Sequence, residues 1–246
     1  MRKVKQRSKN EESFYQQTSF ITKDVLCQAF LEFNEDLGIW EFDEGFPINE
    51  FENVVNKPTK VSLTADNKQM YFSYLDKASG KYQIYCSHSV GGVWSKPENI
   101  GNIVNDATAN LVDPFITADG NTLYFSSDKK GGQGGYDIWV THKSKNSSWL
   151  KPTNLGKRIN TPRNETSPYL HADNNSFYFS SNGWKGFGDM DLFYLDLNNI
   201  TMKQPLNIGQ EINSEGNESE IMLKKDGKTA YRSEWNKDKK NYDLVT

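Results

Sequence analysis

Acidic side chains are the residues of this sequence whose placement could support catalysis. Asp113, Glu165, Glu218 and Glu220 stand at or just before the starts of expected strands, so a fold that gathers those strands would gather their carboxyl groups. Two carboxyl groups facing each other across a pocket are the machinery of glycoside hydrolysis. Acids at strand starts also commonly cap turns or lie at a solvated rim. We therefore expect no catalytic residues, with a glycan-acting enzyme, a glycosidase, as the alternative.

Other catalytic and ligand-binding chemistries lack the residues that they need. A sialidase would require three arginines around the substrate carboxylate, but two of the three arginines within the repeats share one loop. These arginines are Arg158, Arg163 and Arg232. The three histidines do not form a metal-binding cluster, and they are His88, His142 and His171. The glycine run Gly131–Gly135 joins two expected strands, whereas a phosphate loop needs a helix N-terminus after it. We expect no cofactor and no metal ion.

The cysteines give no sign of a metal site either. Cys27 and Cys86 form no CxxC pair and occupy no repeated position. Buried free thiols are the expected state of both side chains. A disulfide between them is the alternative in an oxidising compartment.

The composition favours an all-β protein. The 246 residues include 14 Phe, 12 Tyr and 6 Trp, and wide aromatic rings suit the pleated faces of strands. The 18 glycines, with many Asn and Asp, indicate frequent tight turns. The formal net charge of −3 gives no general basic face, so we expect no nucleic-acid partner.

The chain offers little to place it in a membrane. Its apolar stretches are far shorter than a membrane span, so no direct membrane insertion is expected. The basic residues 1–13 indicate a solvated, disordered tail, and no apolar segment follows them as in a secretory signal peptide. The residues alone therefore leave open a cytoplasmic protein or a chain whose leader lies elsewhere.

A repeat of about 53 residues dominates the sequence. Each copy has a short apolar strand, a tight turn and a strand of the Tyr-Phe-Ser-Ser type, as in residues 113–127 and 167–181. The turn aspartates recur at intervals of 53, 54 and 53 residues, and they are Asp66, Asp119, Asp173 and Asp226. Asp-Gly, Asp-Asn and Asn-Asn pairs tolerate the positive φ of a tight hairpin turn. The pattern predicts a repeated β-hairpin.

Two further strands complete each copy. A polar or Gly-rich loop leads to a third strand whose second residue is an aspartate in three copies, namely Asp137, Asp191 and Asp243. We expect these carboxylates to accept backbone hydrogen bonds and tie strand to loop, rather than to bind calcium. A closing element then carries Pro97, Pro152 or Pro205. A proline cannot donate to a ladder, which predicts an edge strand.

Four strands with the proline-bearing one outermost describe a blade of a β-propeller. We expect a single propeller domain over residues 14–246, with five blades and a degenerate first one. The expected blades are residues 14–56, 57–105, 106–160, 161–213 and a partial blade 214–246. N-terminal strands would complete the last blade, because a closed ring leaves no exposed sheet edges.

The combined motifs resemble a known family. The pattern over residues 114–127, followed by Tyr136-Asp-Ile-Trp139 and residues 149–160, is similar to the WD-like, TolB-type propeller repeat of bacterial envelope proteins. It covers residues 60–246 strongly and 14–56 weakly. The family often carries OmpA-like domains, and some members belong to Bacteroidetes secretion and gliding machinery. The resemblance implies a non-catalytic interaction or scaffold module, periplasmic or associated with the outer membrane. Protein or peptidoglycan-associated partners are implied.

The loops between second and third strands are where we expect a partner to bind. In a four-stranded blade these loops share a face with the blade-to-blade connections. Exposed aromatic rings beside cations are typical of binding hot spots. The candidates are Lys129, Lys130, Trp184, Lys185, Phe187, Arg232 and Trp235. Trp184 and Phe187 could instead fold back over the blade edge, and the sequence does not separate the two alternatives.

Overall fold

The computed structural model describes two compact units, Met1–Lys57 and Pro58–Thr246. The backbone is described for residues 15–22, 25–34, 39–47, 60–91, 93–223, 230–236 and 241–245, and side chains for 60–91, 94–223 and 230. The expected tail, residues 1–13, and the turn aspartate Asp226 lie outside the described residues. The single-domain boundary of 14–246 stays a prediction.

The first unit holds one antiparallel sheet of three strands in the order β1-β2-β3. The strands are β1 (Tyr15–Thr22), β2 (Val25–Asn34) and β3 (Ile39–Pro47). They cover the strands expected near Phe20, Val25 and Ile39. That this sheet acts as a degenerate first blade stays a prediction.

The described strands of the second unit form four antiparallel sheets that follow one another along the chain. The first sheet contains β4 (Val61–Leu63), β5 (Gln69–Asp76), β6 (Lys81–Val90), β7 (Val93–Trp94) and β8 (Glu98–Asn99). The second contains β9 (Leu111–Ile116), β10 (Thr122–Ser127), β11 (Asp137–His142) and β12 (Thr153–Asn154). The third contains β13 (Glu165–Leu170), β14 (Ser176–Ser181), β15 (Asp191–Asp196) and β16 (Leu206–Asn207). The fourth contains β17 (Ile221–Leu223), β18 (Ala230–Asn236) and β19 (Asn241–Val245).

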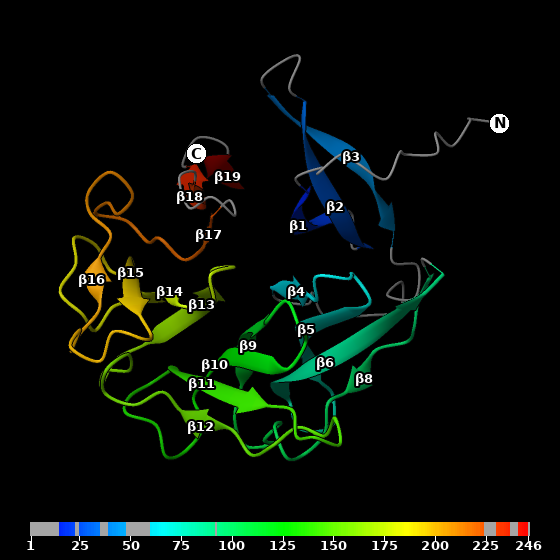
Figure 1. Ribbon diagram of the computed structural model, residues 1–246, viewed down its shortest axis with the longest axis horizontal. Helices are drawn as coiled ribbons and strands as arrows, with labels where there is room; N and C mark the ends of the chain where they lie inside the picture. The colour runs from blue at the N-terminus through cyan, green and yellow to red at the C-terminus, as the bar shows by residue number, and fades with distance from the viewer. Residues whose placement is uncertain are drawn as a thin grey trace. The chain divides into compact units, whose positions relative to one another are not determined.

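The expected blade pattern is present, with one addition. The strands that follow Pro97, Pro152 and Pro205 lie at the outer end of their sheets, as the missing proline N–H predicts. The first sheet of this unit has five strands instead of the expected four. The reason is that β6 runs ten residues and its end also pairs with the short β7. In Figure 1 successive sheets follow one another around the unit, with β4, β9 and β13 toward the middle.

Tight turns and bulges shape each hairpin. The residue after each described turn aspartate has a positive φ, with values of 54° at Asn67, 71° at Gly120 and 56° at Asn174. The inner strands β9 and β13 each contain a register shift against the next strand. Asp113 and Ser167 lie at these shifts with φ of 50° and 52°. Such bulges bend a strand and redirect its side chains.

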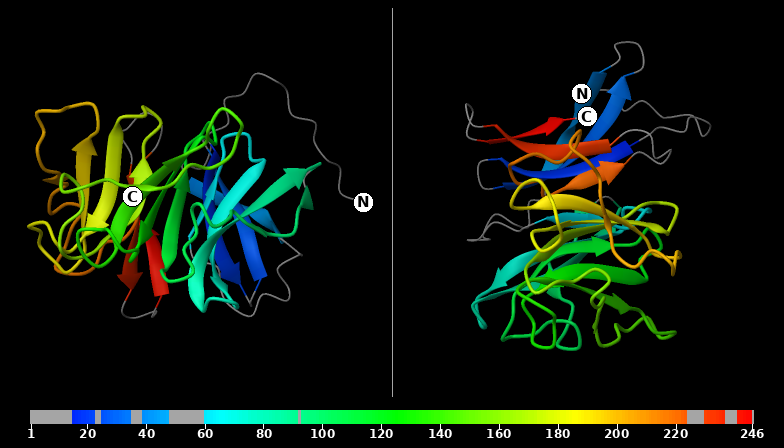
Figure 2. Two further views of the ribbon diagram at one scale, coloured as in Figure 1. Left: turned by 90° about the horizontal axis from the view of Figure 1, so that it is seen from below. Right: turned by 90° about the vertical axis from the view of Figure 1, so that its left-hand side faces the viewer.

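The hydrophobic core lies between neighbouring sheets, which pack face to face (Figure 2). One cluster joins the sheets of β4–β8 and β9–β12 and includes Tyr71, Ile84 and Phe125. A second joins the sheets of β9–β12 and β13–β16 and includes Phe177 and Phe179. Cys86 is a buried free thiol within the first cluster, and burial raises its pKa to about 11. The side chain of Cys27 lies outside the described residues.

The closing element of each blade is fixed by a repeated asparagine clamp. The side-chain oxygens of Asn105, Asn160 and Asn213 accept from a backbone N–H of the third strand at 2.8–2.9 Å. Their amide groups donate to the carbonyl of the same residue in that strand. Each asparagine side chain therefore makes the hydrogen bonds to the third strand that a backbone group of the fourth strand would otherwise make. It does so where the chain turns toward the next blade.

Candidate functional site

The loops between second and third strands share a face with the blade-to-blade connections, as expected. Gly135 N–H donates to the Arg163 carbonyl at 2.7 Å. Tyr136 N–H donates to the Asn164 side-chain oxygen at 2.9 Å. The Asn164 N–H in turn donates to the Asn182 side chain at 3.0 Å. We call this surface, formed by residues 128–136, 161–164 and 182–189, the loop face. Its parts are tied together by backbone N–H groups that donate to a backbone carbonyl and to asparagine side chains.

Two buried aspartates anchor the loop face. Asp137 accepts hydrogen bonds from the Gln133 and Gly134 N–H groups, and its side chain is completely buried. Asp191, one repeat later, accepts from the Phe187 N–H at 3.0 Å and the Gly188 N–H at 3.1 Å. These are the strand-to-loop contacts expected from the sequence. The side chain of Asp243 lies outside the described residues.

Two glycines of the second loop allow this close approach. A Cβ at Gly186 would collide with the Asp191 carboxylate, and one at Gly188 would collide with the Gly216 carbonyl. The loop therefore lies directly on the aspartate and on the next connection. A loop held in this way loses little conformational entropy when a partner binds.

The structure separates the candidate aromatic residues of the loop face. Phe187 is 44 % exposed, and its neighbour Lys185 is also exposed. Trp184 is half-buried, its ring packs on the second core cluster, and its Nε1 donates to the Ile159 carbonyl at 2.8 Å. Of the two alternatives that the sequence left open, Trp184 folds back over the blade. Phe187 remains a candidate for partner contact.

The four cationic and C-terminal candidates have different surroundings. Lys130 is exposed. Lys129 is mostly buried against the preceding connection, and its Nζ lies 3.1 Å from an Asp106 carboxylate oxygen. Arg232 and Trp235 belong to β18, and their side chains lie outside the described residues. The loop face thus offers Lys130, Lys185 and Phe187 as described, exposed contacts.

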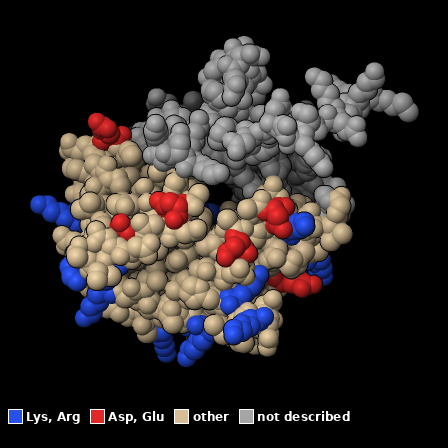
Figure 3. All heavy atoms as spheres, in the orientation of Figure 1, with Lys and Arg blue, Asp and Glu red and all other residues tan. Residues whose placement is uncertain are grey.

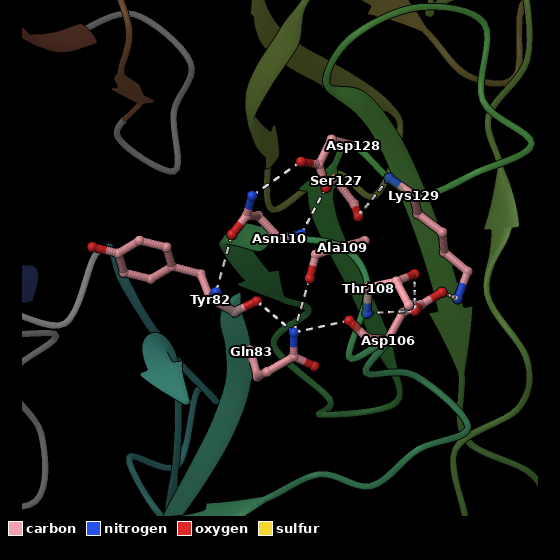
Figure 4. A network of polar contacts seen from close by, with 9 residues as sticks. All are labelled: Tyr82, Gln83, Asp106, Thr108, Ala109, Asn110, Ser127, Asp128 and Lys129. Carbon is pink, nitrogen blue, oxygen red and sulfur yellow. Dashed lines mark hydrogen bonds and ion pairs between the residues drawn. The ribbon is translucent and has the colours of Figure 1, made fainter. Parts of the chain in front are cut away.

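Lys129 belongs to a polar network that joins two blades (Figure 4). Asp128 accepts from the Asn110 backbone N–H at 2.6 Å and from its side chain at 3.0 Å. Asn110 in turn accepts from the Tyr82 N–H at 3.1 Å. Hydrogen bonds from Thr108 and the Lys129 ammonium lower the pKa of Asp106 to about 2. The network holds the connection to the blades on both sides.

A second set of functional side chains lies at the start of the inner strands. Lys60, Asp113, Ser167 and Glu220 occupy the same repeat position, at intervals of 53, 54 and 53 residues. Lys60 Nζ lies 3.9 Å from Glu220 Oε1, and the Ser167 N–H donates to Asp113 Oδ2 at 3.3 Å. We call these four residues the inner ring. Sequence reasoning selected only its two acids, although the repeat spacing alone would have aligned all four.

Asp113 has the most unusual environment of the inner ring. Burial raises the pKa of its carboxyl group, the Lys60 ammonium opposes this shift, and the Glu220 carboxylate adds to it. A raised carboxyl pKa beside a second carboxylate is the electrostatic setting of a general acid. Glu220 is about half exposed and lies beside Lys60 rather than free.

The other two acids considered for catalysis stabilise turns. Glu165 is completely buried and accepts from the Thr161 N–H at 2.8 Å, the Thr161 hydroxyl at 2.7 Å and the Ser181 hydroxyl at 2.7 Å. Burial raises the pKa of Glu165, and these hydrogen bonds oppose the shift. Glu218, one repeat later, accepts from the Ser214 N–H at 3.0 Å and the Ser214 hydroxyl at 2.5 Å. Both carboxylates cap the connection that precedes an inner strand.

Among the described residues, no group of three or more His, Cys, Asp or Glu side chains could hold a metal ion. No helix among them has the length and apolar character needed to cross a membrane.

Comparisons with known proteins rest on structure rather than sequence. No family model and no curated protein matches this sequence. TolB from Acinetobacter baumannii is 13 % identical, with a TM-score of 0.57 over 90 % of this chain and 46 % of that one. The Bombyx mori GH32 β-fructofuranosidase BmSUC1 is 11 % identical, with a TM-score of 0.55 over 95 % of this chain and 60 % of that one. The fold is a β-propeller.

At these identities the likeness concerns the fold alone. This propeller spans about half the length of TolB and three fifths of the length of BmSUC1. BmSUC1 is named as a β-fructofuranosidase, and that activity is stated for BmSUC1 alone. The number of blades stays a prediction, as does completion of the last blade by N-terminal strands.

Proposed function

We propose that this propeller is a non-catalytic binding module that presents its loop face to a protein partner in the bacterial cell envelope. The observation that carries the proposal is the contrast between Phe187 and Asp191. Phe187 exposes its ring, while its backbone N–H is held by the buried Asp191 carboxylate. An exposed ring on a fixed backbone is a preorganised contact, and aromatic anchors beside cations dominate binding energies.

The use of the acids supports a binding role over a catalytic one. Four acidic side chains accept hydrogen bonds that hold the connections and loops in place. They are Glu165, Glu218, Asp137 and Asp191. In the view of Figure 3, most lysine and arginine side chains lie along the outer rim of the described face, and acidic ones lie nearer its middle. Such a charge distribution favours a partner with the complementary pattern.

The envelope setting rests on two similarities. The repeat motifs over residues 60–246 resemble those of TolB-type envelope propellers, and the TolB fold itself superimposes with a TM-score of 0.57. We infer a periplasmic or outer-membrane-associated location from this likeness. The partner would be a protein, free or associated with peptidoglycan, and a role in secretion or gliding machinery is included in the proposal.

The test uses position-specific cross-linking in the full chain. A photoreactive amino acid at position 187 should give a discrete cross-linked product in cells that vanishes with Lys185→Glu. The matched control places it at Leu150, which is 50 % exposed on another surface. Co-sedimentation with purified peptidoglycan separates direct glycan binding from a protein partner. Equal cross-linking from positions 187 and 150 would refute the loop face as a binding site.

A glycan-acting enzyme is the second candidate, and Asp113 is the observation that favours it. Its raised pKa and the nearby Glu220 carboxylate give the two acids that glycoside hydrolysis needs. The measurement is hydrolysis of a panel of chromogenic aryl glycosides by the full chain. Activity abolished by both Asp113→Asn and Glu220→Gln would establish the enzyme and replace the binding module.

A further inference from the structure

The outer part of one blade is basic, whereas the same part of its two neighbours is acidic. Residues 138–164, which run from β11 through β12 to the next connection, contain six lysines and arginines and no aspartate or glutamate. The equivalent residues of the preceding repeat, 84–110, contain one lysine and two acids. Those of the following repeat, 192–217, contain one lysine and three acids. The positive charge therefore belongs to this blade and is not a property of the repeat.

Three of these six cations project into solvent. Lys145, Lys151 and Lys157 are exposed, and none of them forms an ion pair with an acidic residue in the part of the chain that the structure describes. Leu150, which precedes Lys151, is 50 % exposed. We call these four residues the basic edge. Its ammonium groups are available to an external anion.

The other three cations already have contacts or belong to another surface. Lys143 Nζ lies 5.0 Å from the centre of the Trp149 ring and 3.2 Å from Gln69 Oε1. The Arg158 guanidinium donates to four backbone carbonyls within residues 196–202 of the next blade. Arg163 belongs to the loop face. Trp149 packs against the first core cluster, so the basic edge presents aliphatic and cationic side chains rather than an aromatic ring.

The basic edge follows the outermost strand of its sheet. Lys145 lies in the turn of residues 144–148, Lys151 precedes β12 and Lys157 follows it. The Leu150 N–H donates to the His142 carbonyl of β11 at 2.9 Å, so the backbone here is fixed to the sheet. In the view of Figure 3, lysine and arginine side chains gather along the lower rim, where Figure 1 places β11 and β12. Acidic side chains lie higher on that face.

We propose that the basic edge binds the surface of a lipid bilayer that contains anionic phospholipids. A flat surface that touches the rim of the second unit at β12 meets these side chains together. The neighbouring sheets, whose equivalent segments are acidic, turn away from it around the unit (Figure 1). Lysines near an anionic bilayer are attracted to its negative surface potential. Leu150 adds apolar contact at the level of the headgroups, and no segment crosses the bilayer.

The side chains of the basic edge favour a lipid surface over other polyanions. Single-stranded nucleic acids are bound by aromatic rings that stack on bases between cations, and protein hot spots are enriched in Trp, Tyr and Arg. The basic edge instead combines flexible lysines with one aliphatic residue. Lysine is a hydrated point charge without a fixed hydrogen-bonding geometry, which suits mobile headgroups.

The test is co-sedimentation of the full chain with sucrose-loaded vesicles. The vesicles contain three parts of phosphatidylcholine to one part of phosphatidylglycerol, and phosphatidylcholine alone serves as the reference. We expect the protein to pellet with the anionic vesicles at low ionic strength and less at physiological ionic strength, because salt screens exposed charges. The inference is independent of the loop face. A lipid surface gives no discrete protein cross-link from position 150, so that control keeps its meaning.

Substitutions locate the contact on the protein. Lys145→Gln, Lys151→Gln and Lys157→Gln should each weaken the partition coefficient about fivefold, and the triple variant about a hundredfold. Lys96→Gln is the matched control, because Lys96 is exposed, precedes a proline as Lys151 does, and has Glu98 close by. It should leave binding within about twofold of wild type. The thermal unfolding of each variant should match wild type, since all the substituted side chains are exposed.

Different outcomes would overturn the proposal. Wild-type protein that pellets equally with both kinds of vesicle would exclude an electrostatic contact with lipid. An equal loss in Lys96→Gln and Lys151→Gln would show that overall charge, and not the basic edge, drives binding. If the vesicles leave the protein in solution while fluorescein-labelled polyglutamate binds with the same losses in the lysine variants, the occupant is an acidic protein segment. A labelled single-stranded oligonucleotide that behaves in this way would identify a nucleic acid instead.

Discussion

Lys60 and Glu220 occupy equivalent positions three repeats apart, and their charged groups lie 3.9 Å from each other. Lys60 precedes β4 and Glu220 precedes β17, so the pair joins the first and last inner strands of the second unit. The Tyr169 hydroxyl makes a similar link, because it donates to the Leu223 carbonyl at 3.3 Å. The inner strands therefore contact one another through side chains rather than through backbone ladders.

Asp113→Asn should stabilise the protein at pH 8, by on the order of 1 kcal/mol. Its pKa in the folded state is raised by burial, so the folded state holds this proton more tightly than the unfolded state. Wild-type stability is therefore lost as pH rises through that pKa, and the amide removes this loss. Asparagine also tolerates the positive φ at this position. Urea unfolding at pH 4, 6 and 8 measures the effect.

The stability difference between Asp113→Asn and wild type should shrink toward pH 4, because the unfolded state also binds this proton as the pH approaches its own pKa of about 3.9. Asp189→Asn, a substitution at an exposed acid, is the control. An Asp113→Asn protein that is less stable than wild type at pH 8 would contradict the buried-charge account.

Asp137→Asn and Asp191→Asn should each destabilise the protein by about 2–4 kcal/mol. An amide replaces one acceptor oxygen with a donor, and both aspartates are buried with two loop N–H groups directed at the carboxylate. Chemical denaturation gives the free energy of unfolding, and hydrogen exchange at Gly134 and Gly188 reports the loops. Unchanged exchange in both variants would show that the carboxylates do not hold the loops.

Trp184→Ala should destabilise the protein much more than Phe187→Ala. Trp184 loses packing on the second core cluster and the 2.8 Å hydrogen bond to Ile159, which predicts a loss of about 2–3 kcal/mol. Phe187 is 44 % exposed, so its truncation should change the free energy of unfolding by less than about 0.5 kcal/mol. Thermal unfolding measures both. A large melting-temperature drop for Phe187→Ala would remove it from the proposed partner contact.

Asp106→Asn should reduce the loss of stability in acid. Hydrogen bonds from Thr108 and the Lys129 ammonium hold the Asp106 pKa at about 2, below the unfolded value of about 3.9. The stabilisation is therefore present above pH 4 and is lost as pH falls toward 2. We expect the variant to be about 1 kcal/mol less stable at pH 7, after allowance for solvent screening. At pH 2 the two proteins should converge, as measured by urea unfolding.

The blade architecture could be predicted because the sequence repeats it. Some repeated residues have the same local physical role in each described copy that carries them. They are the turn aspartates, the edge prolines and the aspartates at 137 and 191. A residue with a local structural role recurs at the same position of the repeat, so its spacing and residue type suffice to predict that role. The extra strand β7 was not predicted, because it depends on how far β6 extends beyond its partner strand.

The contacts of the inner ring could not be predicted in the same way. The repeat spacing aligns Lys60, Asp113, Ser167 and Glu220. Because they share a position but not a chemical type, the sequence does not indicate what their side chains contact. The assignment of Trp184 to the core and Phe187 to solvent also required the packing of the adjacent blade.

The contact between Gly186 and Asp191 limits how this surface can change during evolution. Any side chain at Gly186 or Gly188 would displace the loop from its anchor, so those positions cannot contribute to recognition. Lys185 precedes Gly186 and Phe187 lies between the two glycines. Both residues face solvent, where substitution leaves the anchor intact. A duplicated blade could therefore acquire a new partner by replacing two residues, while the scaffold beneath them stays the same.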